Sequence, residues 1–351
     1  MDGGFSRLAS TRCRNLLRAS VWISIMTLRY TALISILALG LFAEPLPVEA
    51  QKVPRIGFLS ALSVNSIAPR MEAFRQSLGK LGYVEGENII IEWRSADGDF
   101  DRLPNLAAEL VDLKVDLIVS VGPTGTRHLA NATKTIPIVM GTSNDPVGSG
   151  FVTSLARPGG NITGLSILAP ELSGKKLELL KQMVPGLSRV AVFGHSPEPG
   201  NAQSLKEVEL SAKALGVKIQ YFDVVSPKNL ESAFRDASKG LADGLLTLRS
   251  PVIGSQRIQV VELAAKNRLP TIYARAKFVE AGGLVSYGVS FTDMFRRVAT
   301  YVDKILKGAK PGELPVEQPT EFVLVINLKR AKQLGITIPP SVLYRANRVI
   351  R

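Results

Sequence analysis

The chain has 351 residues, which is enough for about two domains of 100–200 residues each. Its composition, 46% hydrophobic, 21% charged and 6% aromatic, is typical of folded globular proteins and excludes a disordered chain. The chain has one cysteine, Cys13, and two histidines, which excludes a disulfide framework, a thiolate zinc cluster and a histidine-rich metal site. The net charge is +13, but the basic residues are too scattered along the chain to predict a nucleic-acid partner.

Residues 1–50 predict a secretory signal peptide. They contain five arginines and no lysine, followed by an uncharged run from Tyr30 to Ala43 and by Val48-Glu49-Ala50. The run is shorter than the roughly 20 residues that span a bilayer. We therefore expect cleavage near Ala50 and a periplasmic or otherwise extracytoplasmic protein. An uncleaved anchor is the alternative, and Met26 is a second possible start.

After Gln51, strand-like and helix-like segments alternate, which predicts a parallel sheet covered by helices. Lobe 1 is expected over residues 51–164. Its apolar runs predict strands at 55–60, 88–93, 115–121 and 136–140, and its helical spacings predict helices at 68–80, 103–113 and 124–133.

The alternation then restarts, which predicts lobe 2 over residues 165–283 with part of 321–351. Expected helices lie at 175–184, 202–215, 230–239 and 256–267, and expected strands at 189–193, 217–224, 244–248 and 270–273. The strands at 283–287 and 321–326 and the helix at 293–306 come too late to extend this lobe simply. Part of 284–320 is therefore expected to return to lobe 1, which gives an α/β fold of two doubly wound parallel-sheet lobes joined by crossover strands.

The basic tail has two interpretations. The stretch from Asn327 to Arg351 contains no acidic residue and six Lys or Arg residues. We interpret it as a solvated basic face, with docking to membrane lipid or to an acidic partner as the alternative.

Sequence templates for catalysis and for cofactor binding are not found. The chain has no Gly-x-Ser-x-Gly elbow and no GxxxxGK[ST] loop, and Gly148-Ser149-Gly150 lacks the third glycine of a dinucleotide fingerprint. Asp97–Asp101 begins like a calcium loop, but Arg102 replaces the turn glycine. We expect no catalytic residue, no metal and no cofactor.

Small polar and aromatic residues follow several predicted strands. In open α/β sheets ligands bind outside the carboxyl ends of the strands, next to helix N-termini. Helix capping and loop solvation are the alternative roles for such residues. The candidate ligand-binding residues are Ser60, Asn65, Thr124, Thr142, Asp145, His195, Ser196, Arg249, Tyr273 and Tyr287.

Several segments carry a family resemblance. The main ones are Asp145–Val152 and Leu155–Gly164, supported by 52–59, 82–88, 281–288, 304–311, 314–319 and 322–335. Together they resemble the ABC transporter substrate-binding proteins of the tryptophan/tyrosine type, which have the type I periplasmic-binding fold. The resemblance covers residues 52–340 and implies two lobes joined by three crossovers, with a ligand in the cleft between them.

The resemblance implies a binding protein rather than an enzyme. Its expected partners are a small molecule, in this case an amino acid or related compound, and an ABC permease with its ATPase subunit. Contact with the membrane is expected only through the permease. Thr124, Thr142, Arg249 and Asp145 are candidates for holding a carboxylate and an ammonium, and Tyr287 for stacking on a flat side chain. A ligand-sensing receptor component without transport is the alternative function.

Overall fold

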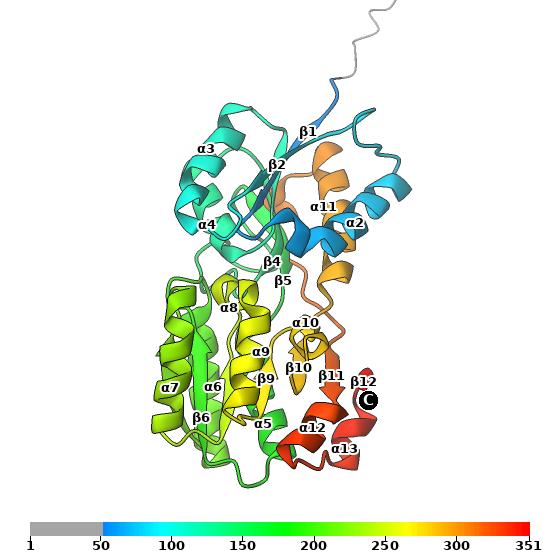
Figure 1. Cartoon of the computed structure of the whole chain (residues 1–351). Coiled ribbons are helices and arrows are strands. Elements are labelled where there is room, and N and C mark those ends of the chain that lie inside the picture. The colour runs from blue at the N-terminus through cyan, green and yellow to red at the C-terminus, as the bar shows by residue number, and fades with distance from the viewer. Residues whose placement is uncertain (1–51) are drawn as a thin grey trace, which may run out of the picture. The chain divides into compact units, whose positions relative to one another are not determined.

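The structure, a computed structural model, describes residues 52–351 (Figure 1). The predicted signal peptide and its cleavage site at Ala50 lie outside the described residues. Within 52–351 the chain builds two separate sheets whose strands are mostly parallel. This confirms the predicted α/β class with two lobes. The lobe that contains the five-stranded sheet is called the first lobe, and the lobe that contains the seven-stranded sheet is called the second lobe.

Five parallel strands form the first sheet: β1 (Arg55–Ser60), β2 (Ile90–Ser95), β3 (Leu117–Ser120), β4 (Ile138–Ser143) and β5 (Ile162–Ser166). Their order is β2-β1-β3-β4-β5, so the chain changes direction across the sheet between β1 and β3. A doubly wound sheet leaves a crevice at such a point, outside the carboxyl ends of its strands.

Helices cover both faces of the first sheet. Successive residues of a strand point to opposite sides, so both sets of side chains are buried. In β1, Phe58 packs with α2 (Val64–Lys80) and α11 (Phe291–Leu306), whereas Leu59 packs with α3 (Leu103–Asp112). The remaining helix, α4 (Pro123–Ala132), lies on the same side as α3 (Figure 1). The late helix α11 thus completes the core of the first lobe.

Seven strands form the second sheet: β6 (Arg189–Gly194), β7 (Lys218–Asp223), β8 (Gly244–Thr247), β9 (Thr271–Tyr273), β10 (Val285–Gly288), β11 (Val323–Asn327) and β12 (Arg348–Ile350). Their order is β12-β11-β10-β9-β8-β6-β7, and only the pair β10–β11 is antiparallel. This one reversal arises because the chain leaves for α11 after β10 and re-enters the sheet from that end.

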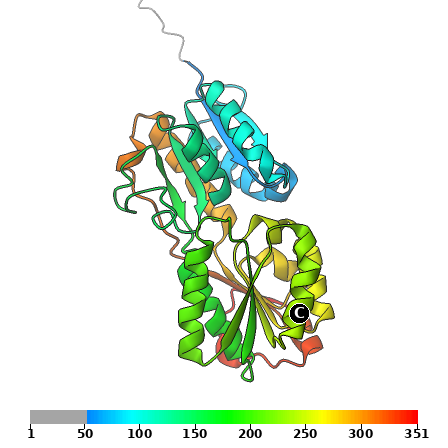
Figure 2. The same ribbon diagram turned by 90° about the vertical axis from the view of Figure 1, so that its left-hand side faces the viewer.

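Helices cover both faces of the second sheet (Figure 2). Val190 and Val192 of β6 pack with α5 (Ala169–Met183) and α6 (Asn201–Leu215), whereas Phe193 packs with α7 (Leu230–Lys239) and α9 (Arg257–Lys266). Two short helices, α8 (Pro251–Ser255) and α10 (Ala276–Glu280), follow β8 and β9 directly.

One expectation about the end of the chain needs correction. The strand predicted at 283–287 extends the second sheet, as β10, although the chain was expected to leave that lobe at residue 283. The strand predicted at 321–326 joins the same sheet as β11, and the segment between β10 and β11 returns to the first lobe, both as expected. The tail forms α12 (Leu328–Leu334), α13 (Pro340–Tyr344) and β12, and five of its six basic residues are exposed, as expected for a solvated basic face. Ile338 and Val342 of this tail pack against the hydrophobic core of the second lobe. The apolar residues of the tail are spread over short elements, so the sequence shows no clear helical or strand period there.

Lys176 is a buried cation in the second lobe. It lies on the inner face of α5 with 2% of its surface exposed, and its Nζ donates a hydrogen bond to the Thr247 carbonyl oxygen at 3.1 Å. Burial lowers the pKa of Lys176 to about 7, because the charged ammonium loses its hydration. The folded protein therefore favours the neutral amine above that pH.

We predict that Lys176 makes stability increase with pH between about pH 7 and pH 10. In this window the unfolded chain still holds the proton, since the ordinary pKa is 10.5, while the folded chain has released it. Relative to Lys176→Met, the wild-type free energy of unfolding should rise by up to roughly 1.4 kcal/mol per pH unit. Urea unfolding at several pH values measures this. Lys175, whose side chain is 42% exposed, provides the control variant Lys175→Met, which should follow the wild-type curve. Parallel curves for all three proteins would refute the assignment.

Candidate functional site

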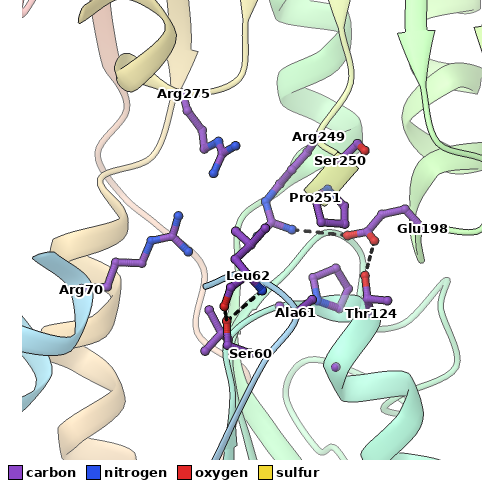
Figure 3. A pocket seen from close by; sticks show the side chains of 14 residues that line it. Ser60, Ala61, Leu62, Arg70, Thr124, Glu198, Arg249, Ser250, Pro251 and Arg275 are labelled. Atoms are coloured by element: carbon purple, nitrogen blue, oxygen red, sulfur yellow. Dashed lines mark hydrogen bonds and ion pairs between the residues drawn. The ribbon is translucent and has the colours of Figure 1, made fainter. Parts of the chain in front are cut away.

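A pocket opens where the carboxyl ends of β1 and β3 meet the loop that follows β8 (Figure 3). The space between its walls, about 420 Å³, includes open solvent, and the cavity itself has a volume of about 40 Å³. The first lobe contributes Ser60, Arg70 and the start of α4, and the second lobe contributes Glu198, Arg249 and Arg275. The pocket therefore lies between the lobes, where the switch of strand direction in the first sheet predicts a ligand site.

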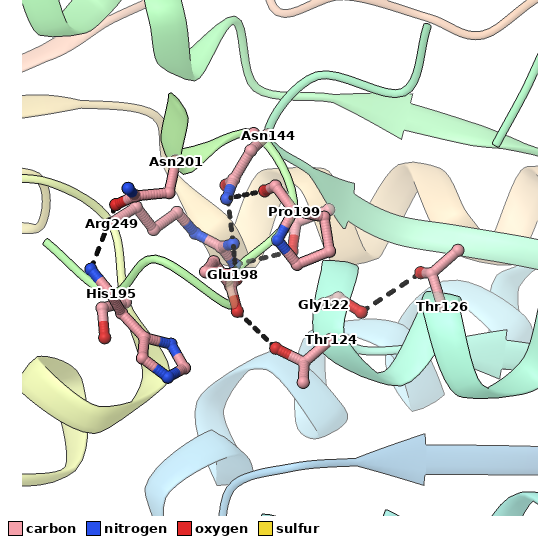
Figure 4. Close-up of polar contacts among 12 residues, drawn as sticks. Gly122, Thr124, Thr126, Asn144, His195, Glu198, Pro199, Asn201 and Arg249 are labelled. Atoms are coloured by element: carbon pink, nitrogen blue, oxygen red, sulfur yellow. Dashed lines mark hydrogen bonds and ion pairs between the residues drawn. The ribbon is translucent and has the colours of Figure 1, made fainter. Parts of the chain in front are cut away.

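Arg249 connects the two lobes. Its Nη1 donates to Asn144 Oδ1 at 2.8 Å (Figure 4). Its Nη2 donates to Thr142 Oγ1 at 2.9 Å, and both partners belong to the first lobe. In its own lobe, Arg249 lies 3.7 Å from the Glu198 carboxylate. Burial lowers the pKa of Arg249, and the negative charge of Glu198 opposes that change. These partners hold the guanidinium in a fixed position at the pocket wall.

Glu198 is the one carboxylate among the residues that line this pocket. It lies just before α6, is 3% exposed, and accepts a short hydrogen bond from the Thr124 hydroxyl at the start of α4. Burial raises the pKa of Glu198, while Arg249 and the hydroxyl of Thr124 counteract this change by stabilising the carboxylate. The Glu198–Thr124 bond is a second polar link between the lobes.

Arg70 and Arg275 have a different environment. Arg70 lies on the buried face of α2, and its Cζ is 4.6 Å from the centroid of the Phe291 ring. Arg275 precedes α10, and its Cζ is 5.6 Å from the centroid of the Phe278 ring. Within residues 52–351 neither guanidinium has an ion pair or a hydrogen bond, and Figure 3 shows both pointing toward the pocket. Burial lowers the pKa of both, that of Arg275 to about 10.

Three of the predicted residues line this pocket and a fourth supports it. Ser60, Thr124 and Arg249 contribute to the wall, and Thr142 is fully buried behind it as a partner of Arg249. Asn65 is not part of it, because it is exposed on the first turn of α2. This part of the site could be predicted because each of the four lies at or just after the carboxyl end of a strand.

Asp145 lines a different cavity between the lobes, beside Asn144, Glu171 and Gln203. Its Oδ1 accepts a hydrogen bond from the Gly148 backbone N–H at 2.8 Å. The interaction is that of a loop cap, which was the alternative role for such residues.

The other four predicted residues lie away from the pocket. His195 is buried, with its ring 6.3 Å from that of Phe100. The exposed Ser196 is bonded to Asp223 through its backbone N–H and its hydroxyl. Tyr273 is 1% exposed and stacks on Phe278 of α10 in the core. Tyr287 packs against the hydrophobic cores of both lobes.

Sequence reasoning missed two polar residues of the site, Arg70 and Glu198. Asn144 and Arg275 follow predicted strands and could be noticed for that reason, but they were not among the candidate ligand-binding residues. Arg70 had a detectable signal, because it lies at helical spacing with Ile67, Met71 and Phe74 on the apolar face of α2. Glu198 stands between two prolines in a loop, and its burial has no counterpart in the local sequence.

The comparisons with known proteins agree with this architecture. The model of the ABC transporter substrate binding protein family matches residues 55–350, which is nearly all of the described chain. The chain belongs to this family. Its members bind solutes outside the cytoplasm and work with an ABC transporter, so the role of this substrate-binding protein is to bind a solute.

Relatives of this substrate-binding protein include a tyrosine-binding protein from Clostridioides difficile, 27% identical over 289 residues that make up 82% of this chain and 83% of that protein. Two solved structures are also similar. A conserved domain protein from Vibrio cholerae has a TM-score of 0.80 and 29% identity, covering 85% of this chain and 100% of that one. A domain from Streptococcus pneumoniae in complex with L-Trp has a TM-score of 0.80 and 29% identity, covering 85% and 99%.

None of the helices within residues 52–351 combines the length and the apolar character needed to cross a membrane.

We predict that Arg249→Met destabilises the protein in a pH-dependent way. The substitution leaves the buried Glu198 carboxylate without its cation, and removing one partner of a buried ion pair costs about 3–5 kcal/mol. A raised pKa of Glu198 means that the folded state favours the protonated acid. The loss should therefore be small near pH 5 and grow as pH rises.

Urea unfolding of the wild type and Arg249→Met at pH 5 and pH 8 measures this difference. The matched background is Glu198→Gln, which has no carboxylate to leave unpaired. There, Arg249→Met should cost the same at both pH values. An equal cost at both pH values in the wild-type background would show that Glu198 does not depend on Arg249.

Proposed function

We propose that this substrate-binding protein captures an amino acid or a closely related compound in the pocket between its lobes. The observation that carries the proposal is the meeting of the Arg249 cation, the Glu198 carboxylate and the first turn of α4 at one cavity. An amino acid needs cationic or N–H donors for its carboxylate and an acidic acceptor for its ammonium. The relatives named for tyrosine and solved with L-Trp support this ligand class.

The ligand carboxylate is assigned to the side of the pocket formed by Arg249, Ser60 and the start of α4. The first N–H groups of a helix have no partner within the helix, and together with the helix dipole they favour an anion. Thr124 and Gly125 belong to that first turn and line the pocket. Pro123 at the beginning of α4 does not interfere, because its missing N–H is one that the helix leaves unpaired.

The ligand ammonium is assigned to Glu198. This side chain is the carboxylate of the pocket lining, and its bond from Thr124 orients one of its oxygens. The sequence favoured Asp145 for this role, but Asp145 lines another cavity. We therefore propose Glu198 in its place.

Delivery to an ABC permease and its ATPase subunit follows in the proposal from family membership. Binding residues come from both lobes, so a ligand that touches both favours the arrangement in which the lobes are close. The permease would then recognise the ligand-bound form. Binding without catalysis also follows in the proposal from family membership.

We predict binding of one or more amino acids by isothermal calorimetry after a thermal-shift screen of amino acids, in which a ligand that binds only the native state raises Tm. Glu198→Gln should weaken that binding at least about tenfold, because the ammonium loses a charged acceptor. The matched control is Asp145→Asn, which makes the same change in the other cavity and should leave affinity within about twofold. Reversed effects of the two variants would assign the ammonium to Asp145, and no binding of any amino acid would refute the proposal.

We also propose export with removal of residues 1–50, on the basis of the arginine-bearing leader, the apolar run and Val48-Glu49-Ala50. N-terminal sequencing of protein from the extracytoplasmic fraction should begin at or near Gln51. A control variant, Ala50→Arg, should slow processing, because signal cleavage requires a small residue before the cut. Full-length protein retained in the inner membrane by the wild type would contradict the proposal.

A further inference from the structure

The pocket contains more positive than negative charge. Arg70, Arg249 and Arg275 all line it, and Glu198 is the one acid in the lining. Glu198 and Arg249 already interact, with Thr124 and Asn144 as further partners. Arg70 and Arg275 therefore leave about two positive charges unbalanced at the pocket wall.

No nearby acid neutralises these two arginines. The charges that act on them are other cations: Arg249 and Arg275 act on Arg70, and Arg249 and Arg257 act on Arg275. Glu280 lies in the adjoining cavity, which Arg70 and Arg275 also line, but it is paired with Arg348. A buried cation without a counter-charge is unfavourable, and proteins retain one chiefly where a partner binds.

Aromatic rings hold the two guanidiniums and leave their N–H groups available. Phe291 lies beside Arg70, with Arg249 on the same ring at 5.4 Å, and Phe278 lies beside Arg275. A cation over a ring face is stabilised without using its hydrogen-bond donors. The three guanidiniums converge on one space in Figure 3. This is a preorganised site for an oxyanion, which guanidinium donors recognise well.

A glycine makes room for one of these groups. A Cβ atom at Gly254 of α8 would lie 1.9 Å from Arg275 Nη2. Any other residue at this position would displace the Arg275 guanidinium, although the helix itself would tolerate a side chain. Gly254 therefore offers a way to move the cation without changing its charge.

We propose that the ligand is an amino acid whose side chain ends in an oxyanion, a carboxylate or a phosphate, held by Arg70 and Arg275. The inference rests on the proposed function and specifies its substrate class. The α-carboxylate and ammonium occupy the Arg249, Thr124 and Glu198 side of the pocket. The side chain extends toward the adjoining cavity, which has a volume of about 370 Å³ and is bounded by Arg70, Arg275 and Lys277.

The test compares matched ligands by calorimetry on protein recovered from the extracytoplasmic fraction. Glutamate is paired with glutamine, 2-aminoadipate with norleucine, and O-phosphoserine with serine. The oxyanion member of at least one pair should bind at least about tenfold more tightly than its neutral partner. The carboxylate and phosphate arms distinguish the two forms of the oxyanion.

The variants Arg70→Gln and Arg275→Gln should each weaken binding of the oxyanion ligand roughly 10- to 100-fold and leave its neutral partner within about threefold. Gly254→Ala should act like Arg275→Gln while keeping the charge. The control is Arg257→Gln, which removes a charge near Arg275 but outside both cavities, and it should change affinity by less than about threefold. Ligand-free Tm should not fall in Arg70→Gln, because an unpaired buried cation is removed.

Two outcomes overturn this inference while the proposed function stands: tighter binding of neutral or aromatic amino acids, or equal effects of the arginine variants on both members of a pair. A third outcome, no binding of any amino acid, overturns both. If Arg257→Gln weakened binding as much as Arg275→Gln, the oxyanion would be held by the general positive potential of the region and not by direct contact with Arg275.

Discussion

The site depends on one buried cation that reaches across two lobes. Arg249 follows β8 of the second sheet, but two of its donors bond to Thr142, near the end of β4 in the first sheet, and to Asn144, just after that strand. A guanidinium has five N–H donors and no acceptor, so its burial is tolerable only where enough oxygen atoms surround it. Its own lobe supplies Glu198, and the first lobe supplies the rest. Polar groups of the first lobe thus replace part of the water that would hydrate Arg249, and the pocket lies beside this contact between the lobes.

The fold was largely accessible from the sequence, since buried strands followed by amphipathic helices have a pattern that local residues determine. β1 and α3 are examples, each within a few residues of its expected bounds. The sequence was less informative where an element is short or owes its place to distant segments. β12 has three residues, and α8 and α10 have five each, too few to show a period. The placement of β10 and β11 in one sheet depends on a partner strand, which the local sequence does not identify.

The candidate site was only half accessible, for a related reason. Residues that follow a strand end, such as Ser60 and Arg249, lie at the pocket because the topology brings them there. Arg70 is instead on a helix and Glu198 in a loop between two prolines, and each reaches the pocket by tertiary packing. Tyr273 shows the opposite case. It is also at a strand end, but the turn into α10 directs its ring into the core, where it stacks on Phe278.

The position of α11 has a consequence for the biogenesis of the protein. This helix closes the core of the first lobe, where Phe295 and Val298 pack with residues of β1 and α2, yet it follows nearly the whole second lobe along the chain. Ribosomes deliver the chain from its N-terminus, so the first lobe cannot complete its core until Leu306 has been synthesised. Contacts between segments so far apart also form slowly, because a long loop must close first. A nascent chain with this connectivity stays incompletely folded for most of its synthesis, which is the state that the export proposed above would require if the chain crosses the membrane before folding.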